Sequence, residues 1–144
     1  PALRDVAPED LEAGLEGLDD VTARRARHVV SENARTVAAA AAMRGGAAAT
    51  LGTLMNESHA SLRDDFEVSS DALDAMADIA RAQHGCFGAR MTGGGFAGCA
   101  VALVEADAAR DFEVAVTAAY RRRTGNEPAV YVTGASDGAE VVAG

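Results

Sequence analysis

The chain has 144 residues, which is enough for one domain or for one half of a larger two-domain enzyme, and 49% of its residues are apolar. Its formal net charge of −9 and isoelectric point near 4.7 argue against a nucleic-acid-binding face, although backbone amides can still bind a small anion. No apolar run reaches the roughly 20 residues of a transmembrane helix, no signal peptide begins the chain and two cysteines make no disulfide framework, so we expect a cytoplasmic protein with no membrane contact.

The first third of the chain predicts two helices. Proline suits the first turn of a helix, so a short helix is expected from Pro8 to about Leu15. A long helix follows, with Asp19 or Asp20 as its N-cap and Gly45 as its C-terminal stop. We expect its buried face to hold Ala26, Val30, Val37 and Ala41. We expect its arginines to be solvated, namely Arg24, Arg25, Arg27 and Arg35.

Two further helices are predicted before residue 86. Apolar residues recur every three or four positions over residues 51–62, and the acidic pair Asp64–Asp65 ends this helix. The next helix is capped by Ser69 or Ser70 and ends at residues 84–85. Its predicted buried residues are Leu73, Met76, Ala77 and Ala80.

A different pattern begins at residue 86. The segments CFGARMT (86–92) and FAGCAVALV (96–104) are apolar or alternate as strands do, and the glycines between them predict a hairpin. A helix is expected over Asp107–Thr124, with three solvated arginines at its C-terminal end and a glycine after it. The segment PAVYVTG (128–134) predicts another strand. This order predicts a single α+β domain over residues 1–144, with helices covering one face of a small antiparallel sheet.

The hairpin contains three consecutive glycines, Gly93 to Gly95, and a fourth, Gly98, in the strand that follows. Glycine supplies a positive φ at little cost, but a tight turn needs only one or two glycines. The additional glycines indicate either close packing against another segment or a nest of backbone N–H groups that binds an anion. The pattern leaves both explanations open. The loop is neither a P-loop, since no Gly-Lys-Ser/Thr follows, nor a dinucleotide-binding loop, since a strand follows.

The segment NESHASLRDDFE (56–67) collects residue types that also occur in catalytic sites. We interpret it as the polar face and C-terminal end of a helix, with Asn56, Ser58 and His59 bonding across to a neighbouring helix. No histidine or cysteine has zinc-ligand spacing to another. We expect Cys86 and Cys99 to be small buried apolar residues rather than nucleophiles.

Three blocks, in their order and spacing, resemble the C-terminal half of the galactokinase family, within the superfamily of galactokinase, homoserine kinase, mevalonate kinase and phosphomevalonate kinase (GHMP kinases). They are RRARHVVSENART (24–36), LGTLMNESHASLRDDFEVSSDALDAM (51–76) and GCFGARMTGGGFAGCAVALV (85–104). The resemblance runs from Leu3 to Ala139. MTGGGFAGC (91–99) matches the third glycine-rich motif of the superfamily, and ESHASLRDDFEVS (57–69) narrows the resemblance to galactokinase. Asp71 stands where the family often has proline, and aspartate suits a helix N-terminus equally well.

The resemblance implies a ferredoxin-like fold and, for the intact protein, transfer of the γ-phosphoryl group of ATP, with Mg²⁺, to the anomeric C1 hydroxyl of α-D-galactose. It also implies that the sugar-binding residues, the base and the main phosphate-binding loop lie in an N-terminal half that these residues lack. The initial Pro1, in place of methionine, likewise indicates a piece of something longer. Phosphoryl transfer depends on positioning and electrostatic stabilisation, so we expect this chain alone to be inactive, without catalytic residues or metal ligands, and to bind no ATP or Mg²⁺.

The third motif implies that Thr92, Gly93, Gly94 and Gly95 support the nucleotide site by lying against the N-terminal phosphate loop, where a Cβ at Gly94 or Gly95 would hold the two loops apart. Arg63 and Asp64 are second candidates, for fixing a helix end that faces the cleft. The expected partner is the N-terminal half, and self-association through the exposed interdomain face is the other way to cover that face. Three alternatives remain: another small-molecule kinase of the superfamily, a non-catalytic sugar-sensing regulator, or, for this chain alone, a folded domain without a ligand.

Overall fold

The computed structural model describes residues 2–138 and residue 141, so Pro1 and Ala139 lie outside the described part of the chain. In chain order, the elements are a 3-10 turn η1 (Leu3–Asp5), helices α1 (Pro8–Gly14), α2 (Asp20–Arg44), α3 (Ala48–Asp64) and α4 (Asp71–Arg81), strands β1 (Cys86–Thr92) and β2 (Cys99–Val104), a 3-10 turn η2 (Ala106–Ala108) and helix α5 (Ala109–Thr124). Within these described residues, no helix combines the length and apolar character that crossing a membrane requires.

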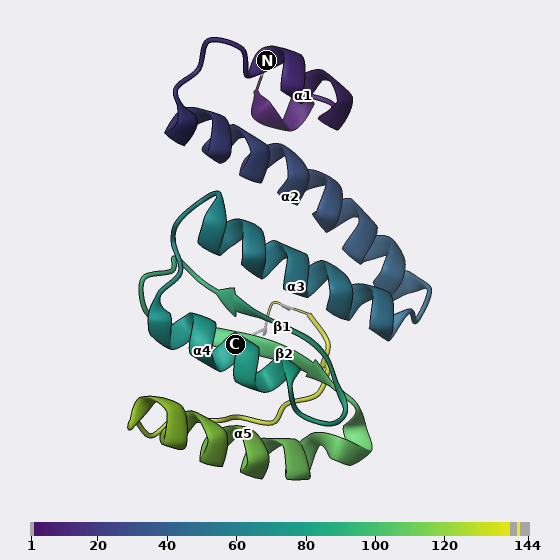
Figure 1. Cartoon of the computed structure of the whole chain (residues 1–144). Helices are drawn as coiled ribbons and strands as arrows, with labels where there is room; N and C mark the ends of the chain where they lie inside the picture. The colour runs from purple at the N-terminus through teal and green to yellow at the C-terminus, as the bar shows by residue number, and fades with distance from the viewer. Residues whose placement is uncertain (1, 139–140, 142–144) are drawn as a thin grey trace.

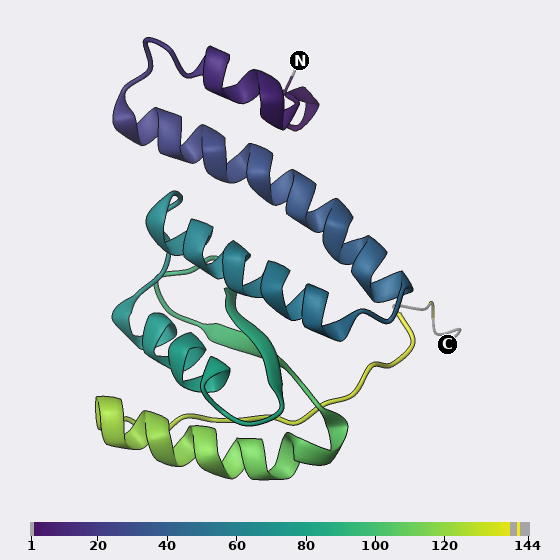
Figure 2. The same ribbon diagram turned by 45° about the vertical axis from the view of Figure 1, so that its right-hand side comes forward.

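The elements stack in layers (Figures 1 and 2). Helix α1 lies on α2, α2 packs against α3, and α3 packs along β1. Strands β1 and β2 form an antiparallel hairpin, with Thr92 paired to Cys99 and Ala89 to Ala102. Helix α4 packs on both strands and α5 packs on α4. The α+β class and the antiparallel hairpin predicted from the sequence are confirmed.

Several predicted helix ends are confirmed by their caps. The carboxylate of Asp19 accepts hydrogen bonds from the N–H groups of Val21 and Thr22, at 3.1 and 3.0 Å, and begins α2. Gly45 is the C-cap of α2, and Gly125 ends α5 with a φ of 76°. The predicted end of α4 is wrong, because the helix stops at Arg81, where the chain must turn to enter β1 at Cys86.

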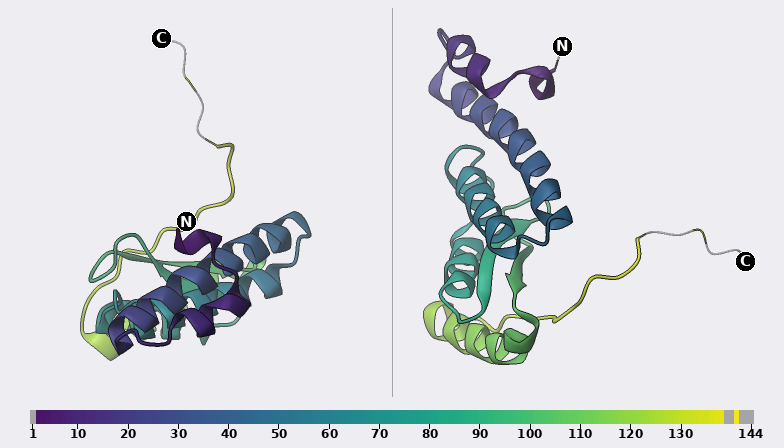
Figure 3. Two further views of the ribbon diagram at one scale, coloured as in Figure 1. Left: turned by 90° about the horizontal axis from the view of Figure 1, so that it is seen from above. Right: turned by 90° about the vertical axis from the view of Figure 1, so that its right-hand side faces the viewer.

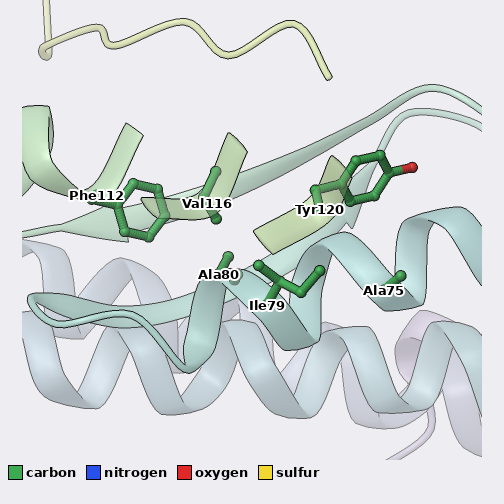
Figure 4. Packing of buried hydrophobic residues seen from close by; sticks show 7 residues of the cluster. Ala75, Ile79, Ala80, Phe112, Val116 and Tyr120 are labelled. Carbon is green, nitrogen blue, oxygen red and sulfur yellow. The ribbon is translucent and has the colours of Figure 1, made fainter. Parts of the chain in front are cut away.

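The main core lies between α4, α5 and the hairpin (Figure 4). Helix α4 contributes Ala75, Ile79 and Ala80, and α5 contributes Phe112, Val116 and Tyr120. Ala89 of β1 completes this cluster, and Val104 and Val130 pack against it from the side. A second, small cluster of Leu15, Ala23 and Ala26 joins α1 to α2. Many of these side chains are alanines, as expected for closely packed helices.

The predicted buried face of α2 is wrong in its second half. Val37 is 70% exposed and Ala41 is also exposed. The reason is that α3 contacts a more polar face of α2, on which Glu32 accepts a 2.6 Å hydrogen bond from Ser58. Arg35 lies on the same face, paired with Glu32 and 3.8 Å from Glu57, and its side chain is only 15% exposed rather than solvated.

The strand predicted over residues 128–134 is not formed. The segment is extended, but its backbone N–H and C=O groups make no hydrogen bond to another segment within the described residues. Val130 packs against the main core, whereas Tyr131 is 85% exposed. Figure 3 shows the segment leaving the body of the molecule. A strand needs a neighbouring edge, and none adjoins this segment among the described residues.

Helix α3 and strand β1 approach each other at two glycines. A Cβ atom on Gly52 would lie 2.1 Å from the carbonyl oxygen of Phe87, and one on Gly88 would lie 2.1 Å from the carbonyl oxygen of Gly52. Backbone atoms on two packed elements cannot move apart independently. The absence of a side chain at both positions therefore sets the distance between α3 and β1.

Replacing Gly52 by alanine should lower the free energy of unfolding by at least ~2 kcal/mol, because the added methyl group must push α3 away from β1. Gly14→Ala is the matched control, because an added Cβ at Gly14, at the end of α1, has no atom within 4 Å. Urea unfolding followed by circular dichroism measures both variants. Equal stability of the two would contradict this account of the α3–β1 contact.

Candidate functional site

The glycine-rich loop occupies residues 93–98, between the paired ends of β1 and β2. Gly93, Gly95 and Gly98 have φ values of 84°, 83° and 112°, a region that favours glycine. Phe96 also has a positive φ, of 60°, although it carries a bulky side chain, and it is 70% exposed. The loop is thus held in a defined and partly strained conformation.

One side of this loop packs against residue Val68. The N–H of Phe96 donates a 2.7 Å hydrogen bond to the carbonyl oxygen of Val68. A Cβ on Gly95 would lie 2.1 Å from that same oxygen, so only glycine fits there without displacement. Close packing, one of the two explanations that the sequence left open, therefore accounts for Gly95.

The other side of the loop is open. A Cβ added to Gly93 or Gly94 would have no atom of the described residues within 4 Å. In the described part of the chain, the N–H groups of Gly93, Gly94 and Gly95 donate to no backbone acceptor. Packing among residues 2–138 does not explain why Gly94 lacks a side chain, and N–H groups of this kind can bind an anion.

The segment that supports the loop, residues 65–70, is fixed to α2. Glu67 forms ion pairs with Arg24, at 3.0 Å, and with Arg25, at 2.6 Å. The hydrogen bonds from Arg25 and Arg24 hold the pKa of Glu67 below its ordinary value. Phe66 stacks on His28 with ring centroids 4.5 Å apart, and the guanidinium of Arg25 lies over the same Phe66 ring. Several contacts thus determine the position of Val68.

Two polar side chains of α3 bond to the edge of β1. Asn56 Oδ1 accepts a 2.9 Å hydrogen bond from the N–H of Ala89, and His59 Nδ1 accepts a 3.1 Å hydrogen bond from the N–H of Met91. These side chains satisfy the donors that face away from β2. The structural interpretation of residues 56–67 is confirmed, with one correction: Asn56 and His59 bond to a strand, and only Ser58 bonds to a helix.

His59 links β1 to the start of α4. Because Nδ1 accepts a hydrogen bond from the N–H of Met91, the neutral ring carries its own proton on Nε2, which lies 3.2 Å from Asp74 Oδ1. This is an electrostatic contact without the alignment of a hydrogen bond. Asp74 Oδ1 also accepts a 2.5 Å hydrogen bond from Ser69 Oγ, next to Val68. A chain of polar contacts thus connects β1 to the segment under the glycine-rich loop.

Arg63 and Asp64 form an exposed pair at the end of α3. Two hydrogen bonds, of 2.7 and 2.8 Å, join the guanidinium to the carboxylate. They raise the pKa of Arg63 and lower that of Asp64. Arg63 borders a surface hollow that is also lined by Asp74 and Asp78, and neither member of the pair contacts the glycine-rich loop by a hydrogen bond.

The described residues offer little covalent or acid–base chemistry around the loop. No group of three histidine, cysteine or carboxylate side chains among them is placed to hold a metal ion. Cys86 is half-buried, and burial raises the pKa of its thiol. Cys99 is exposed, so the prediction that both cysteines are buried is wrong for it, because β2 is covered less than β1 and none of its residues is buried. For contact with a ligand or partner, the loop presents backbone N–H groups and, at Gly93 and Gly94, a surface without side chains.

Known proteins share this fold. The family described as GHMP kinases, C terminal, matches residues 38–122, which include α3, α4, the hairpin with its glycine-rich loop and most of α5. This chain belongs to that family. The resemblance to GHMP kinases inferred from the sequence is therefore confirmed.

The more specific similarity is to galactokinases. A galactokinase of Roseiflexus sp. (strain RS-1) is 48% identical over 137 residues, which are 95% of this chain and 35% of that protein. The crystal structure of Lactococcus lactis galactokinase complexed with galactose superposes with a TM-score of 0.82 at 44% identity, covering 88% of this chain and 33% of that one. The chain thus spans about a third of the length of these relatives.

Stability should fall in mild acid because of the two buried histidines. Desolvation lowers the pKa of His28 and of His59 below the ordinary 6.5. Below pH ~6.5 the unfolded chain therefore binds more protons than the folded chain, so the stabilisation present above pH 6.5 is lost as the pH falls towards the folded-state pKa values. The loss is at most ~1.4 kcal/mol per histidine and pH unit.

Urea unfolding between pH 7.5 and 5 measures this dependence. His59→Gln keeps an acceptor without a titrating ring and should flatten part of it. His84→Gln changes an exposed residue, keeps both buried rings and should show the dependence of the parent chain. A stability independent of pH in this range would contradict the assignment.

Proposed function

We propose that this chain is the C-terminal part of a galactokinase that transfers the γ-phosphoryl group of ATP, with Mg²⁺, to the C1 hydroxyl of galactose. The observation that carries the proposal is the match to galactokinases in sequence and in fold along nearly the whole chain, at 48% and 44% identity. The segment ESHASLRDDFEVS supports the assignment within the family, because its residues build the contacts under the glycine-rich loop. The N-terminal part of the enzyme supplies the base, the sugar site and the main phosphate loop.

In this proposal, residues Thr92, Gly93, Gly94 and Gly95 support the nucleotide site from the C-terminal side of the cleft. The N–H of Phe96 holds the loop on Val68, where Gly95 leaves room for the contact, while Gly93 and Gly94 present an open backbone surface. Phosphoryl transfer is driven by positioning and by N–H groups, metal and charge around the phosphates. A loop whose N–H groups are free, and which lacks Cβ atoms on its open side, suits close contact with a triphosphate or with a second loop that binds one.

A polypeptide of galactokinase length that ends in this chain should phosphorylate galactose with MgATP. A panel of galactose, glucose, homoserine and mevalonate, assayed by ADP release, tests the substrate. Preference for another acceptor would assign the chain to a different kinase of the family. Sugar binding without ADP release would indicate a regulator instead.

The 144-residue chain by itself should bind MgATP no more tightly than ~1 mM, because one loop supplies only a few of the contacts that an enzyme makes with a nucleotide. Isothermal titration calorimetry measures this binding, and circular dichroism of the same sample verifies that the chain is folded. A micromolar dissociation constant would contradict the proposal that the N-terminal part of the enzyme supplies most of the contacts with the nucleotide.

Gly94→Val in the long polypeptide should lower kcat/KM for galactose at least tenfold, equivalent to ~1.4 kcal/mol of barrier. The open surroundings of Gly94 predict that this variant folds normally in the 144-residue chain. Gly95→Ala is the contrasting change, because its Cβ meets the Val68 carbonyl and should lower the thermal stability. Normal turnover by a folded Gly94→Val enzyme would contradict a role for the loop at the nucleotide site.

A further inference from the structure

Both ring nitrogens of His59 face a neighbouring segment, and the side chain is completely buried. Nδ1 accepts the 3.1 Å hydrogen bond from the N–H of Met91 in β1, and Nε2 lies 3.2 Å from Asp74 Oδ1 in α4. A buried backbone N–H that loses its acceptor is costly, so the ring holds Met91 firmly. The contact with Asp74 is looser, because it lacks the alignment of a hydrogen bond.

These two contacts lie next to the two points that hold the glycine-rich loop. Strand β1 ends one residue after Met91, and the loop begins there. On the other side, Asp74 Oδ1 accepts the 2.5 Å hydrogen bond from Ser69 Oγ, and the preceding residue, Val68, accepts the 2.7 Å hydrogen bond from the N–H of Phe96 in the loop. A displacement of the imidazole towards either side therefore changes the position of the β1 end of the loop relative to Val68.

Protonation of the imidazole acts on the two contacts in opposite directions. Neutral imidazole has one acceptor nitrogen, whereas both nitrogens of imidazolium are donors. A proton on Nδ1 faces the N–H of Met91, so that hydrogen bond is lost and two donors oppose each other. The same charge strengthens the contact of Nε2 with the carboxylate of Asp74, because charge-assisted hydrogen bonds are the stronger ones. One proton thus draws the ring from β1 towards α4.

Charged groups on α3 and α4 influence the pH at which this ring titrates. Burial, followed by the positive charge of Arg81, lowers the pKa of His59 below its ordinary 6.5, and the negative charge of Asp74 opposes them. Arg63 acts in the same direction as Arg81, and Asp78 in the same direction as Asp74. The ring is therefore neutral at pH 7 and takes up a proton only in acid.

The other charged side chains on the elements around His59 have partners of their own. These pairs are Arg90 of β1 with Glu32, Glu67 with Arg24 and Arg25, Asp64 with Arg63, and Asp65 with Ser61. Asp74 is thus the carboxylate that the protonated ring meets.

We propose that His59 is a positioning residue for phosphoryl transfer, whose neutral imidazole holds the glycine-rich loop in place at the nucleotide site and whose protonation releases it. The inference rests on the proposed function, which places residues 92–95 at that site. A loop whose β1 end is no longer held aligns its N–H groups less well with the phosphates, so protonation weakens the use of MgATP. The sugar site lies in the N-terminal part of the enzyme in this proposal, so the KM for galactose is not affected.

Two variants of the long polypeptide separate the hydrogen-bond acceptor from the ring. Asparagine places an amide oxygen near the position of Nδ1 and does not titrate, so His59→Asn keeps the contact with Met91. Leucine fills a similar space without an acceptor. At about pH 7.5 we expect kcat/KM for MgATP within about threefold of the parent for His59→Asn and at least about tenfold lower for His59→Leu, with an unchanged KM for galactose in both. Equal losses in the two variants, or full activity of a folded His59→Leu enzyme, would contradict the proposal.

The pH profile needs only the parent and His59→Asn. Both contain the same titrating groups elsewhere, so the ratio of their kcat/KM values for MgATP reports on His59. Between about pH 8 and about pH 5.5 we expect the parent to lose activity relative to His59→Asn as the pH falls, because protonation releases Met91 only in the parent. Circular dichroism at each pH verifies that both proteins are folded. A ratio that does not change with pH would show the proposal to be wrong.

Amide chemical shifts in the same polypeptide test this role without any enzyme assay. With isotope-labelled methionine and glycine, the amide proton of Met91 should move upfield in acid as its hydrogen bond is lost, and the amides of Gly93 and Gly94 should change with the same midpoint. None of these changes should occur in His59→Asn. If the loop amides titrate with Met91 but galactose is not phosphorylated, only the proposed reaction is wrong. If the enzyme is active and these amides do not titrate, only the role of His59 is wrong.

Discussion

The contact between α3 and β1 determines where the other elements of this chain lie. At one end, Gly52 and Gly88 let the two backbones touch, and further along Asn56 and His59 accept hydrogen bonds from the strand. A helix here does what a neighbouring strand usually does, since its side chains satisfy the N–H groups of an exposed strand edge. Once β1 is fixed in this way, β2 pairs with it along one edge, no other described residue pairs with the second edge of β2, and α4 packs over the face of the hairpin.

Helix α3 also helps to position the glycine-rich loop, through His59. His59 connects Met91, one residue before Thr92, to Asp74, and Asp74 connects to Ser69 beside Val68. Val68 is the residue on which the glycine-rich loop rests. The β1 end of the loop and the loop's support are therefore joined through one buried imidazole, that of His59, and both contacts are made by its neutral form. This explains why a polar, catalytic-looking segment has a structural role, with Ser58, His59 and Ser61 buried.

The sequence was sufficient for features that depend on local chemistry. Asp19, Gly45 and Gly125 mark helix ends through their own backbone preferences, and the glycines between two apolar runs mark the hairpin. The resemblance of MTGGGFAGC to a glycine-rich family motif marked the loop as a candidate site. Features set by distant partners were not predictable: nothing near Asn56 or His59 indicates that both will accept hydrogen bonds from a strand about 30 residues later. Val37 was expected to be buried because it is apolar, whereas the neighbouring helix selected the polar face that carries Glu32 and Arg35. For residues 128–134, strand propensity was readable, but a strand requires an edge and propensity cannot supply one.

The tether between Phe96 and Val68 has a consequence for the energetics of recognition. A loop rich in glycine loses much conformational entropy when a ligand orders it, and this loss weakens binding. Here the hydrogen bond to Val68, together with the left-handed conformation of Phe96, already restricts the loop within this chain. The entropy is lost during folding, before any ligand or partner arrives. The open backbone of Gly93 and Gly94 is thus preorganised. A ligand or partner can approach it closely, and its binding causes little further loss of conformational entropy in the loop.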